Sequence, residues 1–229
     1  MILCIETSTD VCSVALVQDG ATTAHTERIG TNAHASTLTP LINKLMTDAG
    51  VTMSQLDAVA VSSGPGSYTG LRIGVSTAKG ICYALNKPLI AVNSLHIIAE
   101  GIFKACSEAR IAVPMIDARR MEVYTEIMNR EGEIISDVEA KIIDKDSFAN
   151  ILSDKELYFG GNGSEKCSQV INNSNAKFVP NILPLAGNMA HIAQYKFDTQ
   201  QFESVAYFEP FYLKEFITTT PKNKVLGAI

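Results

Sequence analysis

The chain has 229 residues, of which 46% are hydrophobic and 19% are charged, so it can bury a sizeable core and does not have the composition of a disordered protein. Its formal net charge is −5 and it has no run of lysine or arginine, which argues against a basic surface that binds nucleic acid directly.

The cysteines predict free thiols in a reducing compartment. The five of them show neither a CxxC pair nor metal-ligand spacing, and they lie in apolar segments: Cys4, Cys12, Cys82, Cys106 and Cys167. The first residues, MILCIETSTD, have no positively charged leader, and no apolar run approaches the roughly 20 residues of a membrane helix. We therefore expect a cytoplasmic protein that does not interact with membranes.

The first half of the chain alternates between strand and helix patterns. Three strands are expected first, over 2–8, 12–20 and 22–29. Apolar residues at helical spacing then predict a helix over 36–50, with Gly50 after its last turn. Two strand–helix pairs complete this half, at 56–63 with 68–85 and at 87–92 with 93–105. Ser67 and either Asn93 or Ser94 are expected to cap the last two helices.

The second half repeats this order. Three strands are expected, then a helix, a strand and a helix, then a short strand and a last helix, over 111–120, 121–132, 133–142, 144–154, 156–161, 162–173, 176–180 and 185–197. Glu6 and Asp117 end the first strand of each half. GPGS, residues 64–67, and GNGS, residues 161–164, follow the fourth strand of each half. These echoes favour an internal duplication.

A duplicated βββαβα order is typical of the actin, sugar-kinase and heat-shock ATPase superfamily. The resemblance implies an α/β, actin-like (ribonuclease H-like) fold with two lobes, here 1–108 and 109–214. It also implies a nucleotide cleft between the lobes, with phosphates held by the first hairpin of each. The tail, 215–229, is expected to be a partly ordered extension, and PFYLKEF, residues 210–216, is expected to pack back on a lobe.

The cleft motifs of that superfamily are only partly present. Its hairpins usually read Asp-x-Gly, because glycine lets backbone N–H groups close around a phosphate. Ser8 and Arg119 stand in the two glycine places, whereas GGNGS keeps its glycines. We expect no cofactor beyond a weakly held or interface-bound nucleotide. The candidate nucleotide or anion contacts are Ser8, Arg119, Gly161 and Gly163.

Three segments together resemble the TsaB (YeaZ) family, over most of the chain from Met1 to about Lys214. They are IETSTDVCSVAL, AVSSGPGSYTGLRIG and DARRMEVYTEI. The family belongs to the bacterial machinery that makes threonylcarbamoyladenosine on tRNA. Its catalytic paralogue, TsaD, binds a metal through a His-x-x-x-His pair on a helix. Here Ser94 and Ile98 take those two places, and only a His96–Glu100 pair is conceivable, so we assign no metal site.

No catalytic residue is assigned either. His34 lies close to Ser36 and Thr37, which suggests a base beside a nucleophile, but capping of the following helix explains these residues better. Glu6 and Asp117 are expected to bind nearby backbone groups.

The helix over 68–85 carries three glycines, and each interior glycine costs about 0.8–1 kcal/mol relative to alanine. One explanation is close packing against the helix at 36–49 in the same lobe. The other, which we favour, is a small-residue face that seats another subunit. The predicted interface residues are Gly70, Arg72, Ile73, Gly74, Thr77 and Ile81.

The resemblance implies a non-catalytic partner of a TsaD-like transferase. With a TsaE-like ATPase, the complex would move threonylcarbamoyl to N6 of the tRNA adenosine next to the anticodon. The chain would contact tRNA only indirectly, through the complex, and would form a homodimer when alone. The alternatives are a small-molecule kinase or ATPase and a metal-dependent peptidase.

Overall fold

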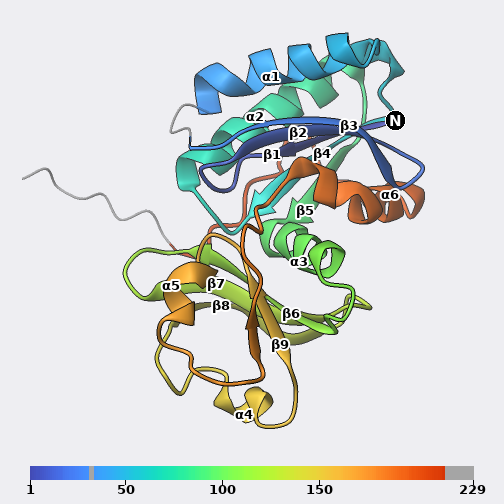
Figure 1. Ribbon diagram of the computed structural model, residues 1–229. Helices are drawn as coiled ribbons and strands as arrows, with labels where there is room; N and C mark the ends of the chain where they lie inside the picture. The colour runs from blue at the N-terminus through green and yellow to red at the C-terminus, as the bar shows by residue number, and fades with distance from the viewer. Residues whose placement is uncertain (31–33, 215–229) are drawn as a thin grey trace, which may run out of the picture.

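The structure, a computed structural model, describes residues 1–30 and 34–214. The described chain forms two five-stranded sheets, one above the other in Figure 1, with helices between and around them. The expected α/β, two-lobed, actin-like fold is confirmed.

The first sheet contains β1 (Ile2–Glu6), β2 (Cys12–Gln18), β3 (Ala21–Arg28), β4 (Ala58–Gly64) and β5 (Leu89–Asn93). Its strand order is β3-β2-β1-β4-β5, and β1 runs antiparallel to β2 and parallel to β4. The central strands are buried because both faces of this sheet are covered, which explains their continuous apolar runs.

The second sheet contains β6 (Ile111–Asp117), β7 (Glu122–Asn129), β8 (Ile134–Ile142), β9 (Leu157–Gly160) and β10 (Ala176–Phe178). Its order is β10-β9-β6-β7-β8, and β6 runs antiparallel to β7 and parallel to β9. Counted from the first strand of each half, the two sheets have the same order and the same strand directions. The structure thus supports the predicted duplication.

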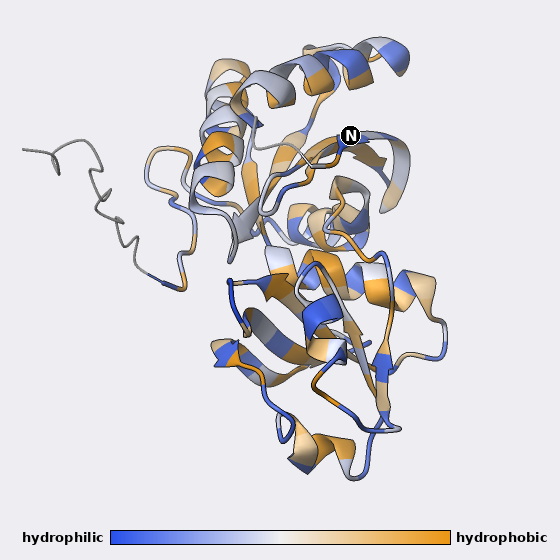
Figure 2. Ribbon diagram, turned by 60° about the vertical axis from the view of Figure 1, so that its left-hand side comes forward, coloured by the Kyte–Doolittle hydropathy of each residue, from blue (hydrophilic) through white to orange (hydrophobic). Residues whose placement is uncertain are grey.

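The helices lie on the faces of these sheets. The described elements are α1 (His34–Asp48), η1 (Met53–Gln55), α2 (Tyr68–Leu85), α3 (Ser94–Ala105), α4 (Ala149–Leu152), α5 (Ser164–Ser168), η2 (Ala186–Met189) and α6 (Ala190–Asp198). α1 and α2 cover one face of the first sheet, and α3 lies between the two sheets (Figure 1). In Figure 2 hydrophobic residues alternate with hydrophilic ones along α1 and α2, the helices at the top.

Two helices of the second half are shorter than predicted. The helix expected over 144–154 covers only Ala149–Leu152, since Phe148 has a left-handed backbone, with φ of 65°. Before it, the Asp144 carboxylate accepts hydrogen bonds from the Ser147 hydroxyl and the Asp146 amide, which form a turn. The helix expected over 162–173 covers only Ser164–Ser168.

The last described helix packs on the first sheet, although it falls inside the predicted second lobe, 109–214. Buried residues of η2 and α6 share a cluster with Ile2, Ala15 and Ile90 of the first sheet. The Ala186 amide donates to Ser13 Oγ over 3.0 Å, and Lys196 Nζ donates to the Ala91 carbonyl over 2.8 Å. Residues 186–198 are therefore structurally part of the first lobe.

The chain then runs back along the first lobe towards the second. The Glu203 amide donates to the Leu89 carbonyl over 2.8 Å, and the Phe211 amide donates to the Ser63 carbonyl over 2.7 Å. Lys214 pairs with Glu122 of β7. The described part of PFYLKEF thus packs back on a lobe, as predicted, whereas the predicted tail at 215–229 lies outside the described residues. Within the described ranges, no helix has the length and apolarity that crossing a membrane requires.

Candidate functional site

The hairpin between β1 and β2 is held by buried polar groups. Glu6 ends β1 with no exposed surface, and its Oε1 accepts a hydrogen bond from the Ser8 amide. Burial raises the pKa of Glu6 to about 7, although hydrogen bonds from Ser8, Ser62 and Thr7 oppose the shift. Ser8, the predicted anion contact, is fully buried. Its side chain therefore does not face an open cleft.

The GPGS loop closes over this hairpin. The Ser67 amide donates to the Ser8 carbonyl over 2.6 Å. A Cβ on Gly66 would lie 2.3 Å from that carbonyl oxygen, so only glycine allows this approach. Ser67 Oγ accepts from the Gly70 amide over 3.2 Å, which confirms Ser67 as the N-cap of α2. The loop packs against the chain's own backbone.

Both predicted interface glycines face inward. Gly70 and Gly74 are buried, and a Cβ on them would lie 2.1 Å from the Thr7 carbonyl oxygen and 2.2 Å from Thr7 Oγ1. Thr7 Oγ1 also donates to the Gly70 carbonyl over 2.8 Å. The reason given for these two residues, space for another subunit, is wrong: the hairpin of the same lobe takes that space. The alternative, packing against the neighbouring helix of the same lobe, is supported in part for Gly70, because a Cβ there would also lie 3.3 Å from Cδ2 of His34, the first residue of α1.

The other predicted interface residues lie nearer the surface of α2. Arg72 is exposed, and Ile73, Thr77 and Ile81 are half-buried. Further exposed residues lie on the same helix: Thr69, Ser76, Gly80, Tyr83 and Ala84. We call these nine residues the outer α2 face. A Cβ on Gly80 would meet nothing within 4 Å, so this glycine, unlike the other two, leaves open space at the surface.

An aromatic and cationic cluster stands at the start of this face. Arg72 Nη1 donates to the Tyr68 hydroxyl over 3.1 Å, and its guanidinium carbon lies 5.4 Å from the centre of the Tyr68 ring. The centres of the Tyr68 and Tyr212 rings are 4.6 Å apart. Sequence reasoning missed Tyr212, because nothing in the pattern of 210–216 says which helix that segment meets.

The second hairpin has the same carboxylate arrangement. Asp117 Oδ1 accepts from the Arg119 amide over 3.0 Å, just as Glu6 accepts from the Ser8 amide. Both carboxylates therefore bind nearby backbone, as predicted. Arg119 adopts φ of 74°, the left-handed conformation that a glycine in its place would favour, and it is exposed. The arginine thus does not prevent the turn from forming.

Lys166 of α5 completes this hairpin, and sequence reasoning missed it. Its Nζ pairs with Asp117 Oδ1 and donates to the carbonyls of Arg120 and Glu122, each over 2.7 Å. A lysine in the first helical turn after GNGS was the available signal. The ammonium group thus lies against the oxygens at the base of the loop.

The glycines of GGNGS also serve internal packing. A Cβ on Gly161 would lie 2.2 Å from the Met115 carbonyl oxygen, and one on Gly163 would lie 3.0 Å from the Asp117 nitrogen. Asn162 Oδ1 accepts from the Asp117 amide over 3.0 Å. The loop lies directly on the end of β6, as GPGS lies on the residues after β1.

The two histidines considered for catalysis or metal binding contact other residues of the fold. His34 Nε2 donates to the Thr9 carbonyl over 2.8 Å, so the ring is tied to the first hairpin. His96 Nε2 lies 3.1 Å from Glu126 Oε1 on β7. Among the residues that the structure describes, no three His, Cys, Asp or Glu side chains form a group that could hold a metal ion.

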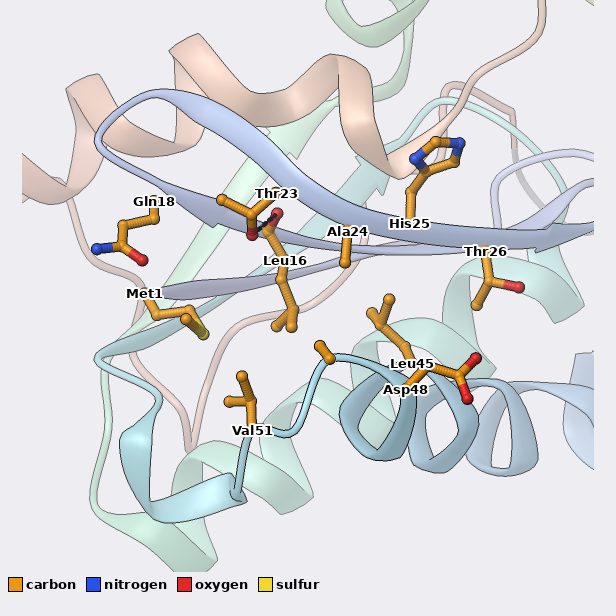
Figure 3. A pocket seen from close by; sticks show the side chains of 11 residues that line it. Met1, Leu16, Gln18, Thr23, Ala24, His25, Thr26, Leu45, Asp48 and Val51 are labelled. Carbon is orange, nitrogen blue, oxygen red and sulfur yellow. Dashed lines mark hydrogen bonds between the residues drawn. The ribbon is translucent and has the colours of Figure 1, made fainter.

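A cavity of about 380 Å³ lies away from both hairpins (Figure 3). Its walls come from the C-terminal end of α1 and from β2 and β3, and Figure 3 shows Leu16, Leu45 and Val51 pointing into it. The first hairpin lies at the other end of α1, where His34 begins the helix and contacts the Thr9 carbonyl. The cavity therefore does not belong to the nucleotide cleft that the superfamily resemblance implies.

Comparisons with known proteins identify relatives of this chain. A family model for TsaD, tRNA N6-adenosine threonylcarbamoyltransferase, matches residues 24–226. The tRNA threonylcarbamoyladenosine biosynthesis protein TsaB of Haemophilus influenzae is 30% identical over 229 residues, covering 95% of this chain and 94% of that protein. The protein of the same name from Escherichia coli is 37% identical over 123 residues, covering 54% and 52%.

A solved structure supports the same assignment. YeaZ from Pseudomonas aeruginosa has a TM-score of 0.80 and 26% identity, and the match covers 93% of this chain and 99% of that one. The resemblance seen in the sequence is thus confirmed, and the chain belongs to the TsaB (YeaZ) family of tRNA threonylcarbamoyladenosine biosynthesis proteins.

Proposed function

We propose that this chain is a non-catalytic partner subunit in threonylcarbamoyladenosine synthesis. It binds a TsaD-like transferase and supports the transfer of threonylcarbamoyl to N6 of the tRNA adenosine next to the anticodon. A TsaE-like ATPase docks at the shared interface, and tRNA is contacted through the complex. Without the transferase, the chain pairs with a second copy of itself. It works in the cytoplasm.

The observation that carries this proposal is the Arg72–Tyr68–Tyr212 cluster at the start of the outer α2 face. Arginine and tyrosine are enriched among the residues that dominate binding energy at protein interfaces. Here the guanidinium is already held by the Tyr68 hydroxyl and ring, so less side-chain entropy is lost on binding. The cluster is therefore suited to anchor a protein partner.

The rest of the outer α2 face suits a helix partner. Ser76, Gly80 and Ala84 are small and exposed, so another backbone can approach closely, and Tyr83 beside them is 86% exposed. Arg72, Ile73, Thr77 and Ile81 remain the proposed contacts. Gly70 and Gly74 are removed from this set because Thr7 fills their space.

The two hairpins support a non-catalytic role. The first is packed under GPGS around the buried Ser8, and the second has Lys166 against its oxygens. A phosphate-binding hairpin offers backbone N–H groups to a nucleotide, and here the Ser8 and Arg119 amides already donate to Glu6 Oε1 and Asp117 Oδ1. We expect titration of the isolated chain with ATP and Mg²⁺ to show weak binding and no turnover. Tight binding with hydrolysis would favour the kinase or ATPase alternative.

The partner role is tested by mixing the chain with the TsaD-like transferase of the same organism and measuring the dissociation constant. Arg72→Glu should weaken association about 30-fold or more, as expected for the loss of an interface anchor. Lys104→Glu is the matched control, because it makes the same charge change at an exposed position of α3. The proposal fails if the unmodified proteins do not associate, or if both variants bind equally well.

A further inference from the structure

The loops after β1 and β6 correspond position by position, and each is held by a side chain from outside the hairpin. Three residues after the carboxylates Glu6 and Asp117 come Thr9 and Arg120. Lys166 Nζ donates to the Arg120 carbonyl over 2.7 Å, and His34 Nε2 donates to the Thr9 carbonyl over 2.8 Å. His34 thus makes in the first lobe one of the contacts that Lys166 makes in the second.

The His34 ring is buried, and only one of its two nitrogens has a hydrogen-bond partner among the described residues. His34 is 6% exposed and is the first residue of α1. A carbonyl oxygen only accepts hydrogen bonds, so Nε2 carries the hydrogen in this contact. Its Nδ1 is buried and has no hydrogen-bond partner among the described residues. An unsatisfied buried nitrogen costs free energy, so the bond to Thr9 is the polar contact that favours this ring position.

The same hairpin also holds the start of α2. The Ser67 amide donates to the Ser8 carbonyl, and Thr7 Oγ1 donates to the Gly70 carbonyl. The His34 ring lies beside this contact, since a Cβ on Gly70 would be 3.3 Å from its Cδ2. The first turns of α1 and α2 therefore meet on one short loop, one through His34 and the other through Gly70.

We propose that His34 is a positioning residue that ties the start of α1 to the first hairpin and thereby fixes the first turn of α2. Its Nε2–H is the group that does this. The outer α2 face begins in that turn, so the His34–Thr9 bond also sets how Arg72 is presented to a partner. This last step rests on the proposed function, whereas the tie between α1, the hairpin and α2 does not.

Three variants separate the hydrogen bond from the bulk of the ring. His34→Gln places an amide nitrogen near the position of Nε2, whereas His34→Asn places it near Nδ1 and His34→Leu provides no donor. On the isolated chain, hydrogen exchange of the amides at 67–71 should quicken about tenfold in the Asn and Leu variants and remain close to wild type in the Gln variant. Association with the transferase should follow the same ranking.

Lys166→Met is the matched control. It removes the equivalent contact in the second lobe and should quicken exchange at 118–122 without changing exchange at 67–71 or partner affinity. The inference is overturned if the Asn and Leu variants exchange like wild type, or if the Gln variant is as impaired as they are. If wild type does not bind the transferase, the proposed function fails, and exchange on the isolated chain still decides the role of His34.

Discussion

Glu6, at the end of β1, has a carboxyl group that is fully buried in the first lobe. Burial raises the pKa of Glu6 to about 7, above the 4.5 of an unperturbed glutamate. The folded state therefore binds a proton more tightly than the unfolded chain does. The contribution of Glu6 to stability is greatest below pH 4.5, falls as the pH rises from 4.5 to 7, and is constant above that range.

This shift predicts how Glu6→Gln changes the pH dependence of stability. The shift corresponds to a loss on the order of 3 kcal/mol between pH 4.5 and 7, which the glutamine variant should not show. Urea unfolding of both proteins at pH 5 and pH 8 measures it. Glu165→Gln, at an exposed position of α5, should keep the wild-type slope. Equal slopes for wild type and Glu6→Gln would contradict the assignment.

At the scale of the element, the glycines of α2 have opposite roles. Gly74→Ala should destabilise the protein by about 1–3 kcal/mol, because the new Cβ would lie 2.2 Å from Thr7 Oγ1. Gly80→Ala should stabilise it by about 1 kcal/mol, because its surroundings are open and alanine favours the helix. Thermal unfolding followed by circular dichroism compares the two. If Gly74→Ala were instead more stable than wild type, the hairpin would have to move away from the new Cβ without any loss of stability.

A large side chain at position 74, as in Gly74→Leu, would not be a clean test of partner binding. The side chain would enter the first hairpin, so any loss of association would accompany damage to the lobe. Arg72→Glu and Lys104→Glu avoid this difficulty because both positions are exposed.

Most elements could be predicted because their signals are local. The spacing of apolar residues predicted β1, β4, α1 and α3. Ser67 and Asn93 are the N-caps of α2 and α3, as the hydrogen-bonding capacity of their side chains suggested. The same local patterns gave the βββαβα order of each half, and that order led to the resemblance to the duplicated fold.

The rest depends on contacts between distant segments. Gly70 and Gly80 look alike in the sequence, but Thr7, more than 60 residues away from Gly70, gives one of them an inward role. Lys166 and His34 likewise hold hairpins to which the sequence pattern gave no link. Local periodicity cannot distinguish a glycine that seats a backbone from one that leaves a surface open.

At the scale of the whole molecule, each sheet is covered by a helix from the other half of the chain. Leu95 and Ile98 of α3 pack with residues of the second sheet, whereas Met189 and Ala193 of η2 and α6 pack with residues of the first. α3 also places Ile97 in the buried cluster of the first sheet, so this helix packs against both lobes, and we expect them to unfold together.

Ala193→Asp tests this coupling. The position is fully buried on α6, so an unpaired carboxylate there should cost about 3 kcal/mol or more. Hydrogen-exchange protection should fall by a similar factor in β1 and in β6, although the substitution touches only the first sheet. Ala149→Asp, at an exposed position of α4, is the control. Loss of protection confined to the first sheet would show that the lobes unfold independently.

The exchange of helices between the halves has a consequence for synthesis on the ribosome. One face of the first sheet is completed by residues 186–198, so its five strands, which are all translated by Asn93, wait for residues that are translated much later. Until α6 has left the exit tunnel, an apolar surface of the nascent protein stays open to water. Chaperones that bind emerging chains would find their target in this first lobe, long after its own five strands have been translated.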